Sequence, residues 1–290
     1  MKRLWFFLLL ALLAAANAMA HDPYRHDPYK LEKKDTVERV FRLAPASQPP
    51  VVKVDNVIGS IAVSAAPGPQ VRLTLKKTLR ADTPEWLARA EKEIRLDVSE
   101  KDGLLELYVD GPLRRHEGRH GECNREYDAV YDFELQVPER CDLVLKTVTG
   151  GDVRVRGVTG SFTVRNVNGR VDLEGIAGSG SGQTVNGDVR ASFRSAPGEA
   201  CSFKTVNGDV EVRLAPGQAA DFKVKTFNGG VYSDLPVQYF PSAGEKPRHE
   251  KGRFVYRSHG FQGVRVGKGG AEITLDTLNG DIVIAGGKPN

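Results

Sequence analysis

The chain has 290 residues, of which 40% are hydrophobic and 27% are charged, and its formal net charge is +4. A charge so close to balance gives no reason to expect nucleic acid as a partner. After the N-terminal region, no stretch approaches the roughly 20 apolar residues that a membrane-spanning helix needs.

Residues 1–20 have the pattern of a secretory signal peptide. Lys2 and Arg3 precede an apolar run from Leu4 to Ala16, and the small-residue pattern Ala18-Met19-Ala20 follows. We expect cleavage after Ala20, although cleavage after Ala18 fits nearly as well. The mature protein is then expected to be periplasmic or secreted, with a net charge of +2 once Lys2 and Arg3 are removed.

Residues 21–50 are expected to form a polar N-terminal arm and linker, with a short strand over residues 36–43. The arm contains a tandem copy that starts at His21 and again at His26. Copper binding at His21 is conceivable, but terminal segments without apolar residues are usually loose. We therefore expect no metal there. Residues 51–290 are expected to form a single β-repeat domain.

One helix is predicted, near residues 84–93. Asp82-Thr83-Pro84-Glu85 combines a capping residue, a proline in the first turn and an acid near the positive end of the helix dipole. Trp86 is expected to anchor this helix in the core. Two strands, residues 94–98 and 104–109, should follow as a hairpin around Lys101-Asp102-Gly103.

The three cysteines predict one disulfide and one leftover thiol, because an exported protein meets an oxidising compartment. Cys123 and Cys141 are the expected pair, and Cys201, at an inward-facing strand position, is expected to be a buried free thiol. The spacing of His116, His120 and Cys123 could present three metal ligands, but a fourth ligand is not evident in the sequence. An exposed loop is the preferred interpretation, and no metal site is predicted.

A short motif recurs along the C-terminal half, and its best copy is Thr205-Val206-Asn207-Gly208-Asp209-Val210. Aligned on the glycine, the copies stand at Gly151, Gly169, Gly187, Gly208, Gly229 and Gly280. Recurrence near twenty residues indicates stacked supersecondary units. We expect regular coils over residues 131–233 and 271–286, separated by an irregular insertion at 234–270.

Two all-β architectures fit this motif. Asn-Gly between alternating apolar residues also predicts hairpins, which would give an antiparallel meander or sandwich. The recurrent asparagine favours a parallel β-solenoid, because stacked coils set identical residues side by side and stacked asparagines bond one another. We therefore predict an all-β, β-helix-like repeat stack with one short helix.

No catalytic constellation is evident in the repeats. Asp152, Asp188, Asp209 and Asp281 occupy one equivalent position, where carboxylates could bind calcium or act as acid and base on a polysaccharide. Arg170 interrupts the column, and no histidine lies between Gly121 and Lys246. We predict neither a catalytic site nor a cofactor, and interpret the aspartates as solvated.

The irregular insertion is the preferred place for function, because loops on a rigid scaffold carry function more often than the scaffold does. Basic and aromatic residues alternate there among prolines and glycines. The candidate binding surface is formed by Tyr239, Phe240, Arg248, Arg253, Tyr256 and Arg257. An anionic envelope polymer or an envelope protein is the expected partner. The alternative is a decorating hairpin whose aromatic side chains pack against the stack.

At Thr184 to Val189, Thr205 to Val210 and Thr277 to Ile282, over residues 51 to 286, the chain resembles a bacterial family of exported β-strand-repeat domains known as putative adhesins. The family has no established function and no catalytic residues to carry over. The resemblance implies a non-enzymatic scaffold or adhesin-like binding module of the cell envelope. Two alternatives remain, a polysaccharide-acting enzyme that uses the repeat aspartates and an accessory protein in envelope-stress sensing.

Overall fold

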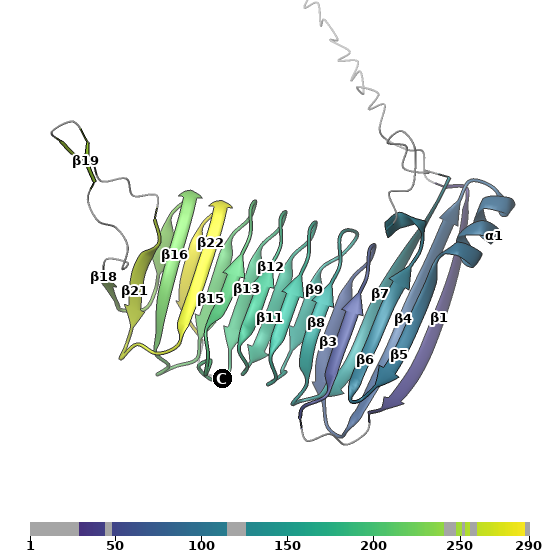
Figure 1. Ribbon diagram of the computed structural model, residues 1–290, viewed down its shortest axis with the longest axis horizontal. Helices are drawn as coiled ribbons and strands as arrows, with labels where there is room; N and C mark the ends of the chain where they lie inside the picture. Colours follow the sequence, from purple (N-terminus) through teal and green to yellow (C-terminus); the bar gives the residue numbers. More distant parts are fainter. Residues whose placement is uncertain are drawn as a thin grey trace, which may run out of the picture.

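The computed structural model describes residues 29–43, 48–114, 126–240, 248–250, 253–255 and 260–287. Two long β-sheets face each other across one core and form an elongated stack (Figure 1). Sheet A has the strand order β1 (Leu31–Arg42), β4 (Gln70–Ala81), β7 (Tyr127–Pro138), β3 (Ile61–Ala66), β9 (Val153–Arg156), β11 (Val171–Ile176), β13 (Val189–Phe193), β15 (Val210–Leu214), β23 (Ile282–Gly286) and β17 (Val231–Ser233).

Sheet B has the strand order β18 (Val237–Phe240), β21 (Gln262–Val266), β16 (Ala220–Asn228), β22 (Glu272–Asn279), β14 (Cys201–Lys204), β12 (Gly180–Gln183), β10 (Phe162–Arg165), β8 (Asp142–Lys146), β2 (Val51–Asp55), β6 (Leu104–Asp110) and β5 (Arg95–Lys101). A separate two-stranded sheet joins β19 (Arg248–Glu250) and β20 (Arg253–Val255). Among the described residues one α-helix, α1, spans Pro84–Glu93, and a short 3-10 helix spans Pro112–Arg114.

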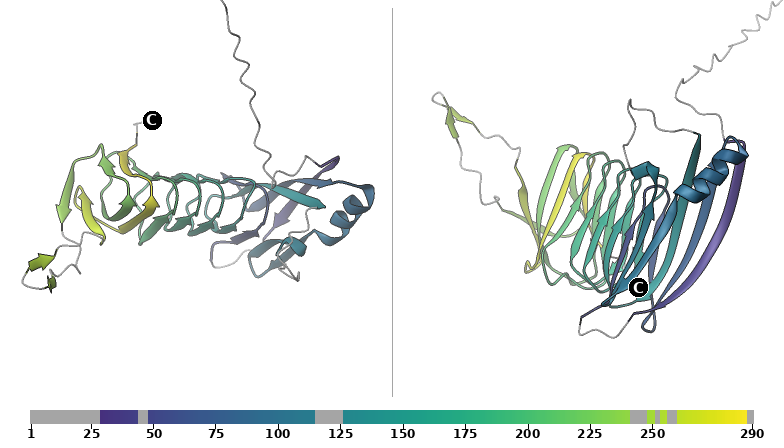
Figure 2. Two further views of the ribbon diagram at one scale, coloured as in Figure 1. Left: turned by 90° about the horizontal axis from the view of Figure 1, so that it is seen from above. Right: turned by 45° about the vertical axis from the view of Figure 1, so that its right-hand side comes forward.

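Each coil of the stack consists of one strand from each sheet, joined by a glycine-containing corner. In spatial order the coils are β2/β3, β8/β9, β10/β11, β12/β13, β14/β15, β22/β23 and β16/β17, and neighbouring coils pair in parallel in both sheets. Seen from above, they form a row of loops (Figure 2). The predicted parallel β-solenoid is therefore confirmed, and the antiparallel meander is excluded for this part of the chain.

The spatial order of the last two coils is the reverse of their order in the chain. β22 pairs with both β14 and β16, and β23 pairs with both β15 and β17. The chain thus leaves one position empty after β15, forms β16/β17, and returns to fill that position with its last coil. In Figure 1 the yellow β22 lies beside the green β16 for this reason.

Asparagine side chains connect successive corners, as the sequence predicts. The Nδ2 atoms of Asn186, Asn207, Asn279 and Asn228 each donate to the Oδ1 of the asparagine in the preceding coil, at 2.7–2.8 Å. The first acceptor in this ladder is Asn168. Each asparagine therefore satisfies its neighbour while it turns the chain.

Inward-facing threonines, all but Thr226 buried, hold the inner side of the same corners. The Thr205 hydroxyl donates to the backbone oxygen of Gly187 at 2.8 Å, and the Thr184, Thr277 and Thr226 hydroxyls make the equivalent bond to the glycine of the preceding coil at 2.8–2.9 Å. The anchor glycine has no substitute, since Gly208 has a φ of +150° and an added Cβ would lie 2.2 Å from the Gly187 oxygen.

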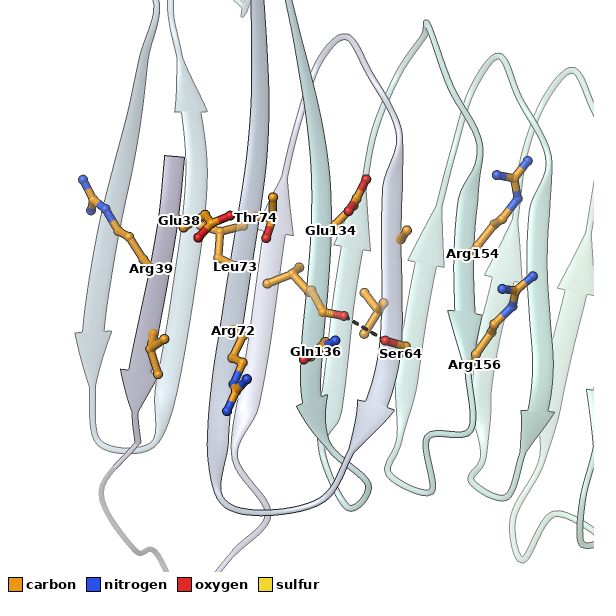
Figure 3. A pocket seen from close by; sticks show the side chains of 14 residues that line it. Glu38, Arg39, Ser64, Arg72, Leu73, Thr74, Glu134, Gln136, Arg154 and Arg156 are labelled. Atoms are coloured by element: carbon orange, nitrogen blue, oxygen red, sulfur yellow. Dashed lines mark hydrogen bonds between the residues drawn. The ribbon is translucent and has the colours of Figure 1, made fainter. Parts of the chain in front are cut away.

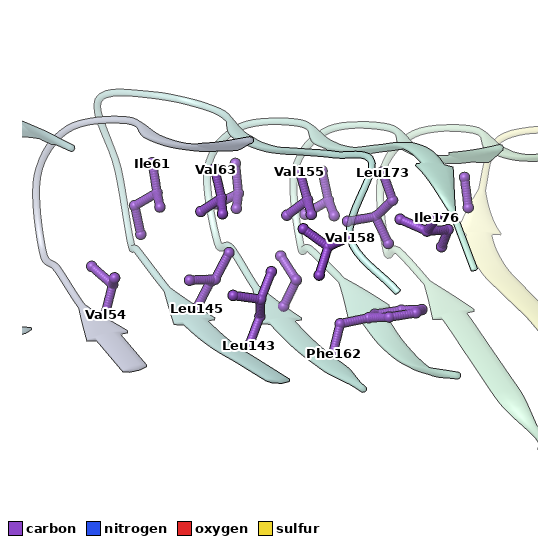
Figure 4. Packing of buried hydrophobic residues seen from close by; sticks show 14 of the residues in the cluster. Val54, Ile61, Val63, Leu143, Leu145, Val155, Val158, Phe162, Leu173 and Ile176 are labelled. Carbon is purple, nitrogen blue, oxygen red and sulfur yellow. The ribbon is translucent and has the colours of Figure 1, made fainter. Parts of the chain in front are cut away.

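Aliphatic and aromatic side chains from both sheets fill the interior of the stack. Val54, Leu143, Leu145 and Phe162 of sheet B meet Ile61, Val63, Val155 and Leu173 of sheet A (Figure 4). In most strands of the coils, buried and more exposed residues alternate, because successive side chains of a strand point to opposite faces. One continuous core therefore runs through all the coils.

Antiparallel elements extend the N-terminal end. β1, β4 and β7 are twelve residues each and pair antiparallel, and β5 pairs with β6 through a turn in which Asp102 and Gly103 have positive φ. Helix α1 lies against this sheet, and the Thr83 Oγ1 accepts a hydrogen bond from the Trp86 N–H at 3.3 Å. The helix has the predicted bounds, and the hairpin has the predicted turn. Residues 31–42 of the expected arm and linker belong to sheet A.

The interval 234–270, expected to be an irregular insertion, contributes two strands to sheet B. β21 pairs antiparallel with β16 and β18, and its Val264 and Val266 are buried. These strands therefore belong to the folded stack.

Candidate binding groove along the stack

On the outer face of sheet A, over β9, β11, β13 and β15, basic side chains pair with acidic side chains of the same face. Arg154, Asp172, Arg190 and Glu211 stand in one register across β9, β11, β13 and β15, so their charges alternate. Arg154 also pairs with Asp152 at 2.7 Å, and Arg156 pairs with Glu174 at 2.8 Å. Burial raises the pKa of the Asp172 carboxyl, while Arg170, Arg190 and Arg154 oppose that rise. These cations already have carboxylate partners.

A broad hollow of about 810 Å³ lies on sheet A, where the solenoid meets the antiparallel extension. It forms over the small side chains of Ala62 and Ser64, and long polar side chains surround it (Figure 3). Glu134 pairs with Lys76 at 2.6 Å, and acidic and basic groups are mixed around the rim. Four arginines and two glutamates line the hollow, and two of these arginines, Arg154 and Arg156, pair with the carboxylates of Asp152 and Glu174.

The repeat aspartates have a structural role that the sequence alone did not predict, although Asp209 is exposed, as a solvated carboxylate should be. Oδ1 of Asp209 accepts the backbone N–H of Asp281 at 2.8 Å, and Oδ1 of Asp281 accepts that of Gly230 at 2.8 Å. Asp152 and Asp188 accept the backbone N–H of Arg170 and Asp209 in the same way, at 2.9 and 3.2 Å. Each carboxylate caps the corner of the next coil. Arg170 lies 3.6 Å from Asp188, in agreement with the predicted relief of charge repulsion.

On the outer face of sheet B, one register forms what we call the charged row. Across β8, β10, β12, β14, β22 and β16 its members are Lys146, Arg165, Gln183, Lys204, Asp276 and Lys225. Arg165 and Lys204 form no ion pair with any described residue, and the Lys225 ammonium lies 5.6 Å from the centre of the Phe261 ring. The row thus presents positive charge that the described fold leaves available.

Beside the charged row runs what we call the apolar stripe. It consists of the residue before each corner asparagine, or its equivalent, namely Val148, Val167, Val185, Val206, Leu278 and Phe227. Val148 and Val167 are half-buried, whereas the other four side chains are exposed, by 38% at Val185, 37% at Val206, 47% at Leu278 and 61% at Phe227. Exposed aliphatic and aromatic side chains in a continuous line are unusual on a soluble surface and mark interaction sites.

A groove of about 620 Å³ separates the charged row from the apolar stripe, and we call it the corner groove. It exists because the intervening threonine points inward to bond the preceding coil, so that no side chain fills the space above it. The volume falls within the roughly 300–1,000 Å³ of small-ligand sites. The corner groove thus has one cationic wall and one apolar wall, and it runs across many coils.

The predicted binding surface in residues 239–257 is only partly described. Tyr239 is 67% exposed at the edge strand β18, and the Phe240 ring lies 5.4 Å from the Arg265 guanidinium. Arg248 and Arg253 lie on β19 and β20, whereas Tyr256 and Arg257 fall outside the described residues. With two of its six residues outside the described part of the chain, the assignment stays a prediction.

The cysteines are described in part. Cys201 is a buried free thiol, as predicted, and burial raises its pKa. Cys141 is also buried and is bonded to no described cysteine, and burial raises the pKa of its thiol from 9.0 to about 12. Cys123 lies outside the described residues, as do His116 and His120, so the predicted Cys123–Cys141 disulfide stays a prediction.

Among the described residues, no three His, Cys, Asp or Glu side chains gather closely enough to hold a metal ion. Nor does any described helix combine the length and the apolar character that crossing a membrane requires. The signal peptide and the tandem histidines also lie outside the described residues.

The corner groove was absent from the sequence prediction, although the sequence contains the signal for it. Aligned on the corner glycines 169, 187, 208, 229 and 280, the position four residues before the glycine gives Arg165, Gln183, Lys204, Lys225 and Asp276, and the position two before it is apolar in each of these five copies. Two outward-facing columns at fixed distances from one corner must form two parallel lines along a solenoid.

The described coils define a two-sheeted parallel β-solenoid with a groove along one face. The chain belongs to the Toastrack DUF4097 family, whose model matches residues 141–285. No curated protein matches the chain.

Solved structures of bacterial proteins are similar to the chain at low identity. A putative cell adhesion protein from Clostridium sporogenes ATCC 15579 is 13% identical over 88% of this chain and 100% of its own, with a TM-score of 0.40. A putative adhesin from Bacteroides fragilis NCTC 9343 is 10% identical over 89% and 98%, with a TM-score of 0.27. A putative adhesin from Parabacteroides distasonis ATCC 8503 is 12% identical over 87% and 97%, with a TM-score of 0.21.

Proposed function

We propose that the protein is an exported, non-enzymatic binding module of the bacterial cell envelope that holds an anionic envelope polymer in the corner groove. The observation that carries this proposal is the contrast between the two faces of the stack. Over β9, β11, β13 and β15 the cations of sheet A pair with carboxylates of the same face, whereas Arg165 and Lys204 of sheet B have no described ion-pair partner and stand beside the apolar stripe. Such a surface attracts an anionic ligand that also has apolar faces.

The alternative of a polysaccharide-acting enzyme is less well supported. Glycosidases use a pair of differently tuned carboxyl groups on either side of the scissile bond. Asp152, Asp188, Asp209 and Asp281 instead accept backbone N–H groups, one on each of several coils. No observation on the described residues favours a role in envelope-stress sensing over simple binding.

Binding of anionic and neutral polysaccharides to the mature protein tests the proposal. The double variant Arg165→Gln/Lys204→Gln should bind anionic polymers about fivefold more weakly, since two exposed ion pairs contribute about 0.5 kcal/mol each. Its matched control is Arg156→Gln/Arg213→Gln, which removes the same charge from the sheet A face. Equal binding by the two double variants would refute the groove assignment, and binding to neutral polymers alone would refute the anionic ligand.

The basic and aromatic surface at residues 239–257 is a second candidate location for the same ligand. Deletion of residues 236–268 is an unsuitable test, because it removes β18 and β21 from sheet B. Replacement of residues 241–259 by a short glycine-serine linker leaves both strands in place. Loss of binding in that variant, with binding retained by Arg165→Gln/Lys204→Gln, would move the site to the loop.

A further inference from the structure

We infer that the corner groove selects a linear polysaccharide with an acidic group on every second sugar, and that Asp276 sets this spacing. The inference rests on the proposed function and adds the chemical class and charge period of the ligand.

The cations available in the charged row stand on alternate coils. Arg165 lies on β10, Lys204 on β14 and Lys225 on β16, with Gln183 on β12 and Asp276 on β22 between them. Adjacent strands of a sheet lie about 4.8 Å apart, so the three cations recur at roughly 9.6 Å. Lys146 on β8 is next to Arg165 in the row and so departs from the alternation, but its ammonium lies 3.8 Å from the Asp55 carboxylate and is already paired.

The residues between the cations disfavour an acid at every position. Asp276 places a carboxylate between Lys204 and Lys225, and it makes no ion pair within 4.0 Å with any described residue. A polymer with an acid on each sugar would bring one of its carboxylates against Asp276 in any register that uses both lysines. Like charges brought together at an interface oppose binding. A neutral sugar at this point would instead offer hydroxyl donors to Asp276 and to the Gln183 amide.

The apolar stripe favours a polysaccharide over other polyanions. Val206, Leu278 and Phe227 are exposed along one wall of the groove, within reach of a ligand that lies over the threonine floor. Pyranose rings have apolar C–H faces that pack on aliphatic and aromatic side chains, and an inorganic polyphosphate has none. A ligand with acids along one edge and ring faces along the other matches both walls.

Asp276 occupies this position only because the last coil is inserted. In chain order, Lys204 and Lys225 belong to successive coils, and β22 separates them by pairing with β14 on one side and β16 on the other. Without β22 the two ammonium groups would stand on adjacent strands. Relief of that repulsion is a structural role that Asp276 also performs, so a test has to separate stability from ligand preference.

The experiment compares hyaluronan, which has a carboxylate on every second sugar, with polygalacturonate, which has one on every sugar, and with polyphosphate. The wild-type protein should bind hyaluronan most tightly. Asp276→Asn should tighten polygalacturonate binding about fivefold and change hyaluronan binding less than about twofold, in line with removal of one or two exposed like-charge contacts. Glu272→Gln is the control, because Glu272 lies on the same strand, outside the corner groove, and pairs with Lys223 at 2.7 Å.

Each outcome has a definite meaning. If, in Asp276→Asn, the ratio of the affinities for hyaluronan and polygalacturonate stays as in the wild type while the melting temperature is unchanged or lower, Asp276 has the structural role only. That result would overturn the inference. If Arg165→Gln/Lys204→Gln still weakens both polymers in that case, the proposed function survives. If the wild-type protein prefers polygalacturonate, the inferred charge period is wrong. If it binds polyphosphate as tightly as hyaluronan, the inferred polysaccharide ligand is wrong. Failure of all three polymers to bind contradicts the inference and the proposed function together.

Discussion

The side chain of Asn279 donates a hydrogen bond to Asn207 at 2.7 Å, although 72 residues separate the two in the chain. Asn279 is also the acceptor for Asn228, which precedes it by 51 residues. These two bonds fix the inserted coil between its neighbours at the corner. The strands of this coil also pair in parallel with both neighbours. Corners that occupy the same position in the repeat therefore meet even when they are far apart in the chain.

The asparagine ladder predicts a graded loss of stability. Asn207→Ala removes two side-chain hydrogen bonds, those to Asn186 and Asn279, whereas Asn228→Ala removes only the one to Asn279. At roughly 0.5–1.5 kcal/mol per bond, Asn207→Ala should cost about twice as much as Asn228→Ala. Urea unfolding of both variants measures this, and equal costs would argue against a continuous ladder.

The corner glycine predicts a large steric penalty. In Gly208→Ala the new Cβ would lie 2.2 Å from the Gly187 oxygen, in addition to the strain of a φ of +150°. We expect a loss of more than about 2 kcal/mol. Gly217→Ala is the matched control, because Gly217 also has positive φ but has no atom within 4 Å of the added Cβ. It should cost only about 1–2 kcal/mol. Thermal unfolding that ranks the two equally would contradict the clash.

The corner aspartates predict that an acceptor atom matters more than charge. Asp209→Asn keeps an oxygen for the Asp281 N–H, whereas Asp209→Ala leaves that N–H without its side-chain acceptor. We expect Asp209→Asn to stay within about 0.5 kcal/mol of the wild type and Asp209→Ala to lose about 1 kcal/mol. Equal losses would point to a role for the charge. Loss of a glycan-cleaving activity in Asp209→Asn would revive the enzymatic alternative.

The buried thiol of Cys141 predicts a loss of stability at high pH. Burial raises its pKa from 9.0 to about 12, so between these pH values the unfolded chain releases a proton that the folded chain retains. The contribution of Cys141 is therefore fully present below pH 9 and is lost as the pH rises toward 12. The difference in unfolding free energy between the wild type and Cys141→Ala should shrink from pH 7 to pH 10.5. A constant difference would mean that the thiol is not protonated and buried.

A thiol-labelling experiment addresses the predicted disulfide. In the native protein at pH 8, iodoacetamide should modify neither Cys141 nor Cys201, because both are buried. After denaturation without a reductant, Cys201 should react. If Cys141 reacts under the same conditions it is a free thiol, whereas a requirement for reductant would establish its pairing with Cys123.

Local signals in the sequence were sufficient for most of the architecture. The Asn-Gly corners, the alternating legs and the capped helix at Thr83 each depend on residues close together in the chain, and each is found in the structure. The order of the coils could not be predicted in this way. The long interval before Gly280 indicates that the period breaks, but Val210 and Ile282 pair only in three dimensions.

The corner groove was not predicted from the sequence, for a related reason. The irregular segment is the predicted place for function because the composition of that segment differs from the rest of the chain. Lys204 and Val206, by contrast, look ordinary within a single copy of the repeat. Their meaning depends on alignment with the same positions of the other coils, since a line of side chains along the stack is a property of many copies together.

The position of the last coil makes the molecule sensitive to the integrity of its own chain. Until residues 272–286 arrive, β15 and β17 have no strand between them, and the coil β16/β17 lacks its neighbour. A polypeptide cut short before Glu272 would expose unpaired strand edges, which proteases and chaperones recognise. The final coil, β22/β23, therefore completes the strand pairing of the coil that precedes it in the chain.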